Sequence, residues 1–203
     1  MTASVSPGYG NTNPQQKEHS KALRSIELAQ YRPPLHLVSP EGQFQVHTAP
    51  YRGSFSVVLS EAIRTAGLGS RVMVAQFLKG GVSQGPKGAT NLCGRLEWLR
   101  PDINICIREK AEDQSDPEEK CALINAVREV WAVCKERILA ENLDQLVLDE
   151  IGLAISLGYL KENDLIDTLE QRPQSMDVII TGPSIPSGLI DMADQITELR
   201  SGH

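Results

Sequence analysis

The fold is decided by residues 43–77, which read QFQVHTAPYRGSFSVVLSEAIRTAGLGSRVMVAQF. Residues 43–48 alternate polar and apolar side chains, as a half-buried strand does. Residues 55–66 place apolar side chains at helical spacing and are followed by glycines, which favour the end of a helix. Residues 71–77 are a nearly continuous apolar run, typical of a strand covered on both faces. Strand, helix and strand together predict a βαβ unit in a parallel sheet.

The rest of the chain continues this alternation. A short strand is expected at 103–107, a long helix at 117–140 and an apolar strand at 144–151. Helical segments follow, then a strand at 177–182 and a closing helix and strand. The stretch 79–91, dense in glycine and lysine, is expected to be a loop. The pattern predicts an α/β fold with a mainly parallel sheet, in which ligands bind at the carboxyl ends of the strands.

The region before this domain has a different composition. Residues 1–16 are rich in Ser, Asn, Gln, Pro and Gly, and we expect a disordered tail there. Residues 17–42 are expected to hold a short helix, over 17–31, and a linker that contains two consecutive prolines. The domain itself is expected to span residues 43–203.

Composition and charge exclude some classes of function. The net charge of −6 and the pI of ≈ 5.3 argue against a broad basic surface for nucleic acid or anionic lipid. No apolar run approaches a membrane span and no signal-peptide pattern is present, so a cytoplasmic protein is expected. The cysteines form no CxxC pair and are expected to be buried free thiols: Cys93, Cys106, Cys121 and Cys134.

The most informative polar pair is Asp149 and Glu150, at the end of the apolar strand 144–151. Carboxylates in this position can hold magnesium beside bound phosphates, because magnesium prefers oxygen ligands. The same pair could instead cap a neighbouring loop or form ion pairs with Lys79 or Arg52. The sequence leaves both interpretations open.

A resemblance to a known family is carried by VAQFLKG at 74–80, LVLDEI at 146–151, RP followed by DVIITG within 172–182, and LIDMADQITELR at 189–200. In order and spacing these segments closely resemble the ATP:corrinoid adenosyltransferases of the P-loop class, over roughly residues 43–203. The resemblance implies a P-loop NTPase-like, three-layer α/β/α fold. It also implies a cytoplasmic homodimer that binds ATP and magnesium and transfers the 5′-deoxyadenosyl group to the reduced cobalt of a corrinoid.

The chain departs from the family at the loop that would hold the phosphates. Family members typically have G-x-G-K-G-K-T-T, where this chain reads APYRGSFS at 49–56. Ser54 stands at the lysine position, Phe55 replaces a hydroxyl that would reach the metal, and Pro50 removes a backbone donor. Arg52 could replace part of the missing charge. The candidates for a degenerate nucleotide site are Arg52, Gly53, Ser54, Ser56 and Lys79, with Asp149 and Glu150 as metal ligands if magnesium-nucleotide binding is retained.

Two further departures affect other substrate contacts. After Thr181 and Gly182 the resemblance implies an arginine-containing turn, but the chain has Pro183 and Ser184. After residues 103–107 the family's aromatic F-T-W segment, which helps displace the lower ligand of the corrinoid, is represented by REKAEDQSD. All the losses touch substrates rather than the core, and a fold alone does not imply the inherited activity.

The leading hypothesis is a non-catalytic relative that uses the old crevice, or the surfaces around it, to bind a regulator, a nucleotide-like ligand or a protein partner. The alternative is an active ATP:cob(I)alamin adenosyltransferase with unconventional phosphate contacts from Arg52, Lys79 and Lys87. A third hypothesis, another phosphate-handling enzyme, lacks an identifiable nucleophile or base. No residue is assigned a catalytic role, and magnesium, ATP and a corrinoid are expected only if family activity is retained.

Overall fold

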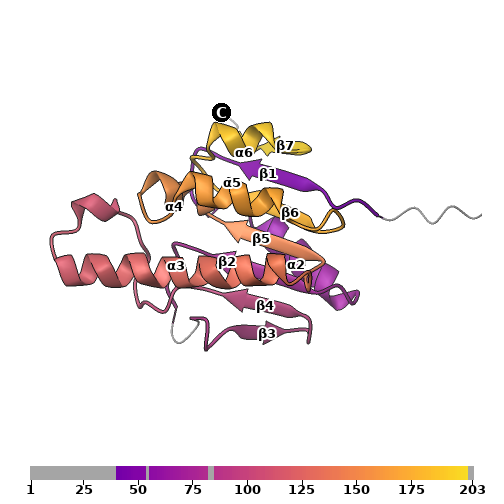
Figure 1. The fold of residues 1–203 in the computed structure, drawn as a ribbon, viewed down its shortest axis with the longest axis horizontal. Helices are drawn as coiled ribbons and strands as arrows, with labels where there is room; N and C mark the ends of the chain where they lie inside the picture. Colours follow the sequence, from indigo (N-terminus) through magenta and orange to yellow (C-terminus); the bar gives the residue numbers. More distant parts are fainter. Residues whose placement is uncertain (1–39, 54, 82–84, 201–203) are drawn as a thin grey trace, which may run out of the picture. The chain divides into compact units, whose positions relative to one another are not determined.

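The protein is described by a computed structural model that covers residues 40–53, 55–81 and 85–200. Its centre is a seven-stranded sheet in the order β3-β4-β2-β5-β6-β1-β7 (Figure 1). Neighbouring strands are parallel except β3 and β4, which are antiparallel. The mainly parallel α/β fold predicted from the sequence is therefore confirmed. The strands are β1 (Phe44–Thr48), β2 (Val72–Gln76), β3 (Thr90–Leu92), β4 (Leu96–Leu99), β5 (Gln145–Asp149), β6 (Asp177–Thr181) and β7 (Gln195–Glu198).

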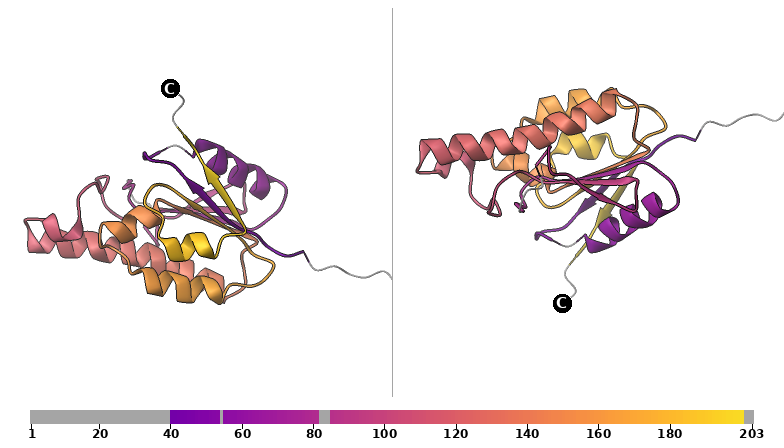
Figure 2. Two further views of the ribbon diagram at one scale, coloured as in Figure 1. Left: turned by 90° about the horizontal axis from the view of Figure 1, so that it is seen from above. Right: turned by 90° about the horizontal axis from the view of Figure 1, so that it is seen from below.

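Helices cover both faces of the sheet. α2 (Ser56–Gly67) lies on one face, and the α-helices that follow it in the described part of the chain lie on the other (Figure 2). The sheet is thus the middle of three layers, as the sequence predicts. The helices of the second layer are α3 (Pro117–Leu139), α4 (Ile151–Ser156), α5 (Glu162–Glu170) and α6 (Ser187–Asp191), and a 3₁₀ turn, η1 (Ala111–Asp113), precedes α3.

The long helix α3 confirms the helix expected at 117–140, and local chemistry explains where it begins. The Asp116 side chain accepts a hydrogen bond from the backbone N–H of Glu118 at 2.9 Å and caps the helix. Pro117 takes the first helical position, where a backbone N–H is not needed. Arg137 lies in the last turn, where a positive charge favours the helix dipole.

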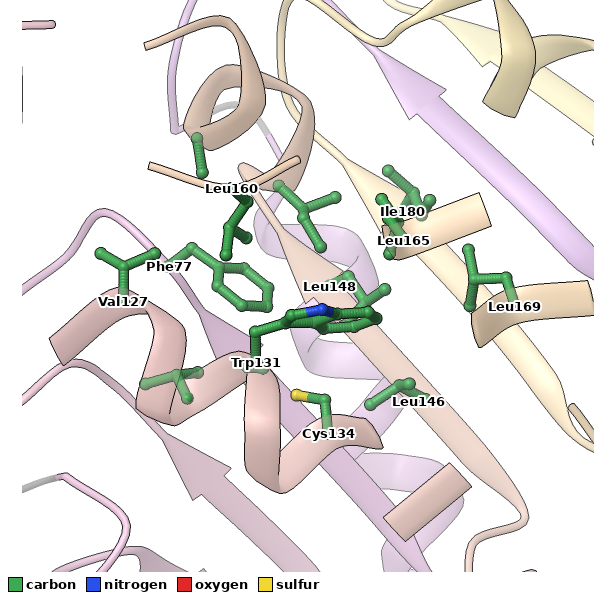
Figure 3. Close-up of a cluster of buried hydrophobic side chains, with 14 of the residues drawn as sticks. Phe77, Val127, Trp131, Cys134, Leu146, Leu148, Leu160, Leu165, Leu169 and Ile180 are labelled. Atoms are coloured by element: carbon green, nitrogen blue, oxygen red, sulfur yellow. The ribbon is translucent and has the colours of Figure 1, made fainter. Parts of the chain in front are cut away.

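The main core lies between α3 and the sheet. Trp131 is 3% exposed and packs near Phe77 and the β5 side chain Leu148 (Figure 3). Its indole N–H donates a 2.6 Å hydrogen bond to Asp164 of α5, and Lys135 binds the same carboxylate. The polar end of the ring is therefore satisfied, which allows the rest to be buried. Trp131 is a core residue, as its place in the apolar stripe predicts.

The parallel strands end together at one edge of the sheet. In register, Gln76 of β2 lies beside Asp149 of β5, which lies beside Thr181 of β6. Gly182, directly after β6, comes so close to β5 that a Cβ there would lie 3.0 Å from the Glu150 Cα. Its φ of +120° also favours glycine. Polar side chains from distant parts of the sequence are thus brought to one place.

The strand expected at 103–107 is wrong. In this segment only Cys106 forms a bridge, an isolated one with Lys79. The segment runs past the end of β2, and both edges of β2 are already occupied, by β4 on one side and β5 on the other, so the segment has no pairing position on that strand. The sequence does not predict β4, because LEWL is too short to show a period of two. β3 also begins at Thr90, inside the loop expected at 79–91.

The cysteines correct a second expectation. All are free, but Cys134 alone among them is buried, whereas Cys93, Cys106 and Cys121 are exposed. Cys93 lies in the turn between β3 and β4 with φ +52°. Cys121 belongs to the first turns of α3, before the buried part of the helix begins at Leu123. Burial raises the pKa of the Cys134 thiol far above its ordinary value.

Two of the expected N-terminal features, the tail at 1–16 and the helix at 17–31, lie outside the described residues. Within the described ranges, no helix combines the length and the apolar character needed to cross a bilayer.

Replacing Trp131 with Ala should lower the free energy of unfolding by about 3–5 kcal/mol, because it leaves a cavity in the core. Chemical denaturation followed by circular dichroism measures this change. Leu139→Ala is the matched control, since Leu139 lies on the same helix but is 57% exposed, and it should change stability little. Equal losses in the two variants would contradict the central place of Trp131 in the core.

A thiol reagent should distinguish the cysteines. In the native protein, Ellman's reagent should react readily with Cys93, Cys106 and Cys121, while Cys134 should react only after denaturation because its thiol is buried and stays protonated. Peptide mapping of the modified protein identifies the sites. Rapid labelling of Cys134 in the folded protein would show that the α3 core opens more easily than its packing indicates.

Candidate functional site

A crevice lies at the carboxyl ends of the strands, where ligands bind in folds of this kind. It is a hollow of ≈ 500 Å³ to which the turn after β1, the end of β2 and the segment before η1 contribute. Acidic residues from the end of β5 meet basic residues here. The crevice is lined by Arg52, Gly53, Lys79, Cys106, Arg108 and Glu150.

Asp149, the last residue of β5, is only 5% exposed, and its carboxylate accepts hydrogen bonds from three side chains. Its Oδ1 accepts from the Thr181 hydroxyl at 2.6 Å, and its Oδ2 accepts from the Gln76 amide at 2.7 Å. Lys79 Nζ donates to the same Oδ2 at 2.9 Å and supplies the opposite charge. A carboxylate can be buried when it is both paired and hydrogen-bonded, and these partners meet both conditions.

The Gln76 amide has a defined orientation because its oxygen and its nitrogen both form hydrogen bonds. Its Oε1 accepts from the Trp98 indole N–H at 3.0 Å and from Arg100 Nε at 2.7 Å, while its Nε2 donates to Asp149. A flipped amide would place a donor against two donors and an acceptor against the carboxylate. Gln76 therefore connects β4, which carries Trp98, to the acidic end of β5.

Glu150 is 1% exposed and adopts a left-handed conformation, with φ +63°, in the turn between β5 and α4. Its backbone N–H donates to the Thr181 carbonyl at 2.8 Å. Its carboxylate accepts from Arg52 Nε at 2.9 Å and from Arg52 Nη2 at 2.6 Å, and Arg52 Nη1 donates to the Ile107 carbonyl at 2.8 Å. The hydrogen bond to Glu150 raises the pKa of Arg52, although partial burial acts in the opposite direction.

In this arrangement the two carboxylates do not fit a magnesium ion. Magnesium requires oxygen ligands in an octahedron, but both oxygens of Asp149 and both of Glu150 already accept protein hydrogen bonds. The Arg52 and Lys79 charges next to these oxygens would also repel a divalent cation. Across the residues that the structure describes, no group of three or more His, Cys, Asp or Glu is placed to hold a metal ion. Instead, Glu150 pairs with Arg52 and Asp149 pairs with Lys79, as in the second interpretation of the sequence.

The turn that stands in place of a phosphate loop carries two aromatic residues, Tyr51 and Phe55, and neither lines the crevice. Phe55 is buried on the α2 side of the sheet, in the cluster that includes Val58. Ser56 begins α2 and is exposed, and it does not line the crevice. Gly53 has φ +78° and open space where a Cβ would stand, so the turn is open at this point. Ser54 lies outside the described residues.

The structure brings together only part of the predicted site. Arg52, Gly53 and Lys79 line one crevice. Lys87, the third cation expected in an active enzyme, lines a different hollow of ≈ 560 Å³ beside α3. A cation from an unpredicted position, Arg108, stands in the crevice instead.

Long-range backbone pairing brings Arg108 to the site. The Ile107 N–H donates to the Leu78 carbonyl at 2.9 Å, and the Gly80 N–H donates to the Ile105 carbonyl at 3.1 Å. These bonds hold the segment before η1 against the end of β2. No local sequence pattern marks this pairing, so sequence reasoning misses Arg108 and the exposed Cys106 beside it.

Replacing Glu150 with Gln should lower the free energy of unfolding by about 1–3 kcal/mol, because the Arg52 guanidinium, which is only 31% exposed, loses its charged partner. Glu61→Gln is the matched control, since it breaks the exposed pair with Arg64 on α2 and should move the unfolding midpoint much less. Denaturant titration measures both. If the two changes are equal, the Arg52–Glu150 pair does not stabilise the crevice.

Comparison with known proteins agrees with the fold. The profile of the ATP:corrinoid adenosyltransferase family BtuR/CobO/CobP matches residues 40–203. A corrinoid adenosyltransferase of Escherichia coli is 31% identical over 155 residues, which is 76% of this chain and 74% of that protein. A corrinoid adenosyltransferase of Pseudomonas aeruginosa is 25% identical over 195 residues, 96% of this chain and 89% of that protein.

A further relative shows that the domain also occurs within a longer chain. An uncharacterised protein of Nostoc sp. is 28% identical over 173 residues, which is 80% of this chain but 44% of the Nostoc protein. The family profile covers most of the chain and extends over the whole described structure. This chain therefore belongs to the ATP:corrinoid adenosyltransferase family.

Proposed function

We propose that this member of the family does not transfer adenosyl groups, and that it uses the crevice to bind a ligand or a partner as a sensing or interaction module. The observation that carries the proposal is the pairing of Arg52 with Glu150 and of Lys79 with Asp149. These pairs neutralise the two cations that a triphosphate would need at this edge of the sheet.

The cost of opening these pairs supports the proposal. A triphosphate that took Arg52 and Lys79 would leave Asp149 and Glu150 buried without their opposite charges, which is strongly unfavourable. The turn offers little in compensation, because Pro50 has no N–H and Ser54 has no charge. Catalysis of this type depends above all on stabilising the charge that develops on the phosphates, so the loss of that stabilisation slows the reaction directly.

The second candidate is an active adenosyltransferase, and a specific observation favours it. Arg52 and Lys79 line the same crevice and lie next to the carboxylates, so all four groups that a magnesium-nucleotide site would use are close together. Such an enzyme would have to exchange its internal ion pairs for contacts with phosphate and metal. The separate position of Lys87 weighs against the set of cations expected for it.

Two other properties belong to the same proposal and rest on family resemblance. Corrinoid adenosyltransferases resemble one another in forming homodimers and acting in the cytoplasm, and we propose both for this chain. We also propose that the protein partner of the interaction module binds at or near the crevice.

The test is an adenosyl-transfer assay with magnesium-ATP and a chemically reduced corrinoid, with the Escherichia coli enzyme as the positive control. One lost transition-state donor costs about 100- to 1,000-fold in rate, so we expect no adenosylated product from this chain above background. Circular dichroism of the same sample confirms that the protein is folded. Turnover within about tenfold of the control would overturn the proposal, and Arg52→Gln and Lys79→Met should then abolish that turnover.

A further inference from the structure

We infer that the crevice binds a phosphoryl-type anion without magnesium, and that Arg108 is the residue that recognises it. This inference rests on the proposed function, because it concerns the same crevice. It names the chemical class of the ligand, which the proposed function leaves open.

The first argument is the balance of charge. Arg52, Lys79 and Arg108 line the crevice, and the carboxylates near them are Asp149 and Glu150. Three positive charges face two negative ones, which leaves one positive charge uncompensated. Positive potential in a hollow of this kind attracts anions.

The second argument is which cation remains available. Arg108 is exposed, and within the described ranges it forms no hydrogen bond or ion pair, whereas Arg52 and Lys79 are both held by carboxylates. An anion can therefore bind Arg108 without breaking a buried ion pair. Binding such an anion therefore costs much less free energy than binding a triphosphate that must displace Asp149 or Glu150.

The third argument concerns the shape of the anion. A guanidinium has five N–H donors and an ammonium has three, so Arg52 and Lys79 keep N–H groups that their carboxylates do not use. Together with Arg108 they offer donors from three segments of the chain around one hollow. A phosphoryl group has three terminal oxygens and can accept from several donors at once, whereas a carboxylate has two.

The fourth argument is the state of the acidic groups. A magnesium ion that arrived with a nucleotide would need oxygen ligands from Asp149 or Glu150, and all of these oxygens are engaged by protein donors. Magnesium therefore has no role in the binding that this arrangement supports. It also lowers the charge of the phosphates that it chelates, which makes them weaker ligands for Arg108.

The experiment is calorimetric titration of the full chain with inorganic pyrophosphate and with ATP, each in EDTA and in excess magnesium. We expect binding in EDTA that magnesium does not strengthen, and a loss of about tenfold or more in affinity for Arg108→Gln. Arg128→Gln is the matched control, because Arg128 is an exposed arginine of α3 outside the crevice lining, and it should bind like the parent. Equal affinity for pyrophosphate and ATP would identify the phosphoryl group alone as the ligand, and tighter binding of ATP would add a nucleoside contact.

Absence of binding in EDTA, binding that needs magnesium, or an Arg108→Gln variant with unchanged affinity would each overturn the inference. These outcomes are separate from a failure of the proposed function, which is read from adenosylated product. If no product forms and no anion binds, the non-catalytic role stands and the phosphoryl ligand is excluded. If product forms, the non-catalytic role fails whatever the titration shows.

Discussion

The edge of the sheet where the parallel strands end depends on the neutralisation of two adjacent buried carboxylates. Asp149 and Glu150 are placed there by the end of β5, and each would be costly to bury alone. The sheet register supplies Thr181 and Gln76 to Asp149, and more distant segments supply Arg52 and Lys79. The turn after β1, the end of β2 and the turn after β5 are therefore held in position by one electrostatic requirement.

Most of the fold could be predicted from the sequence because its signals are local. The apolar run at 71–77, the helix expected at 55–66 and the capped helix at 117–140 all have periods that do not depend on distant neighbours. The strand expected at 103–107 failed for a different reason: its pattern suits a strand, but β4 and β5 occupy both edges of β2. Whether a segment finds a free strand edge depends on the topology of the whole sheet, so the sequence of the segment alone does not show it.

The candidate site could be predicted only in part, for the same physical reason. The end of an apolar strand marks Asp149 and Glu150, and the turn after β1 marks Arg52 and Gly53. Arg108 reaches the crevice through backbone bonds between residues that are far apart in the sequence, and nothing in its acidic surroundings indicates it. Cys93, Cys106 and Cys121 are exposed rather than buried as expected, because they lie in a turn, in the crevice wall and in the first turns of α3.

The Arg52–Glu150 ion pair also affects how the chain can evolve. A change at Arg52 alone would leave the Glu150 carboxylate, which is 1% exposed, without its opposite charge, and a change at Glu150 alone would leave the Arg52 guanidinium without its partner. The two positions, 98 residues apart in the sequence, are therefore coupled, and substitutions that keep the fold stable have to change both residues together.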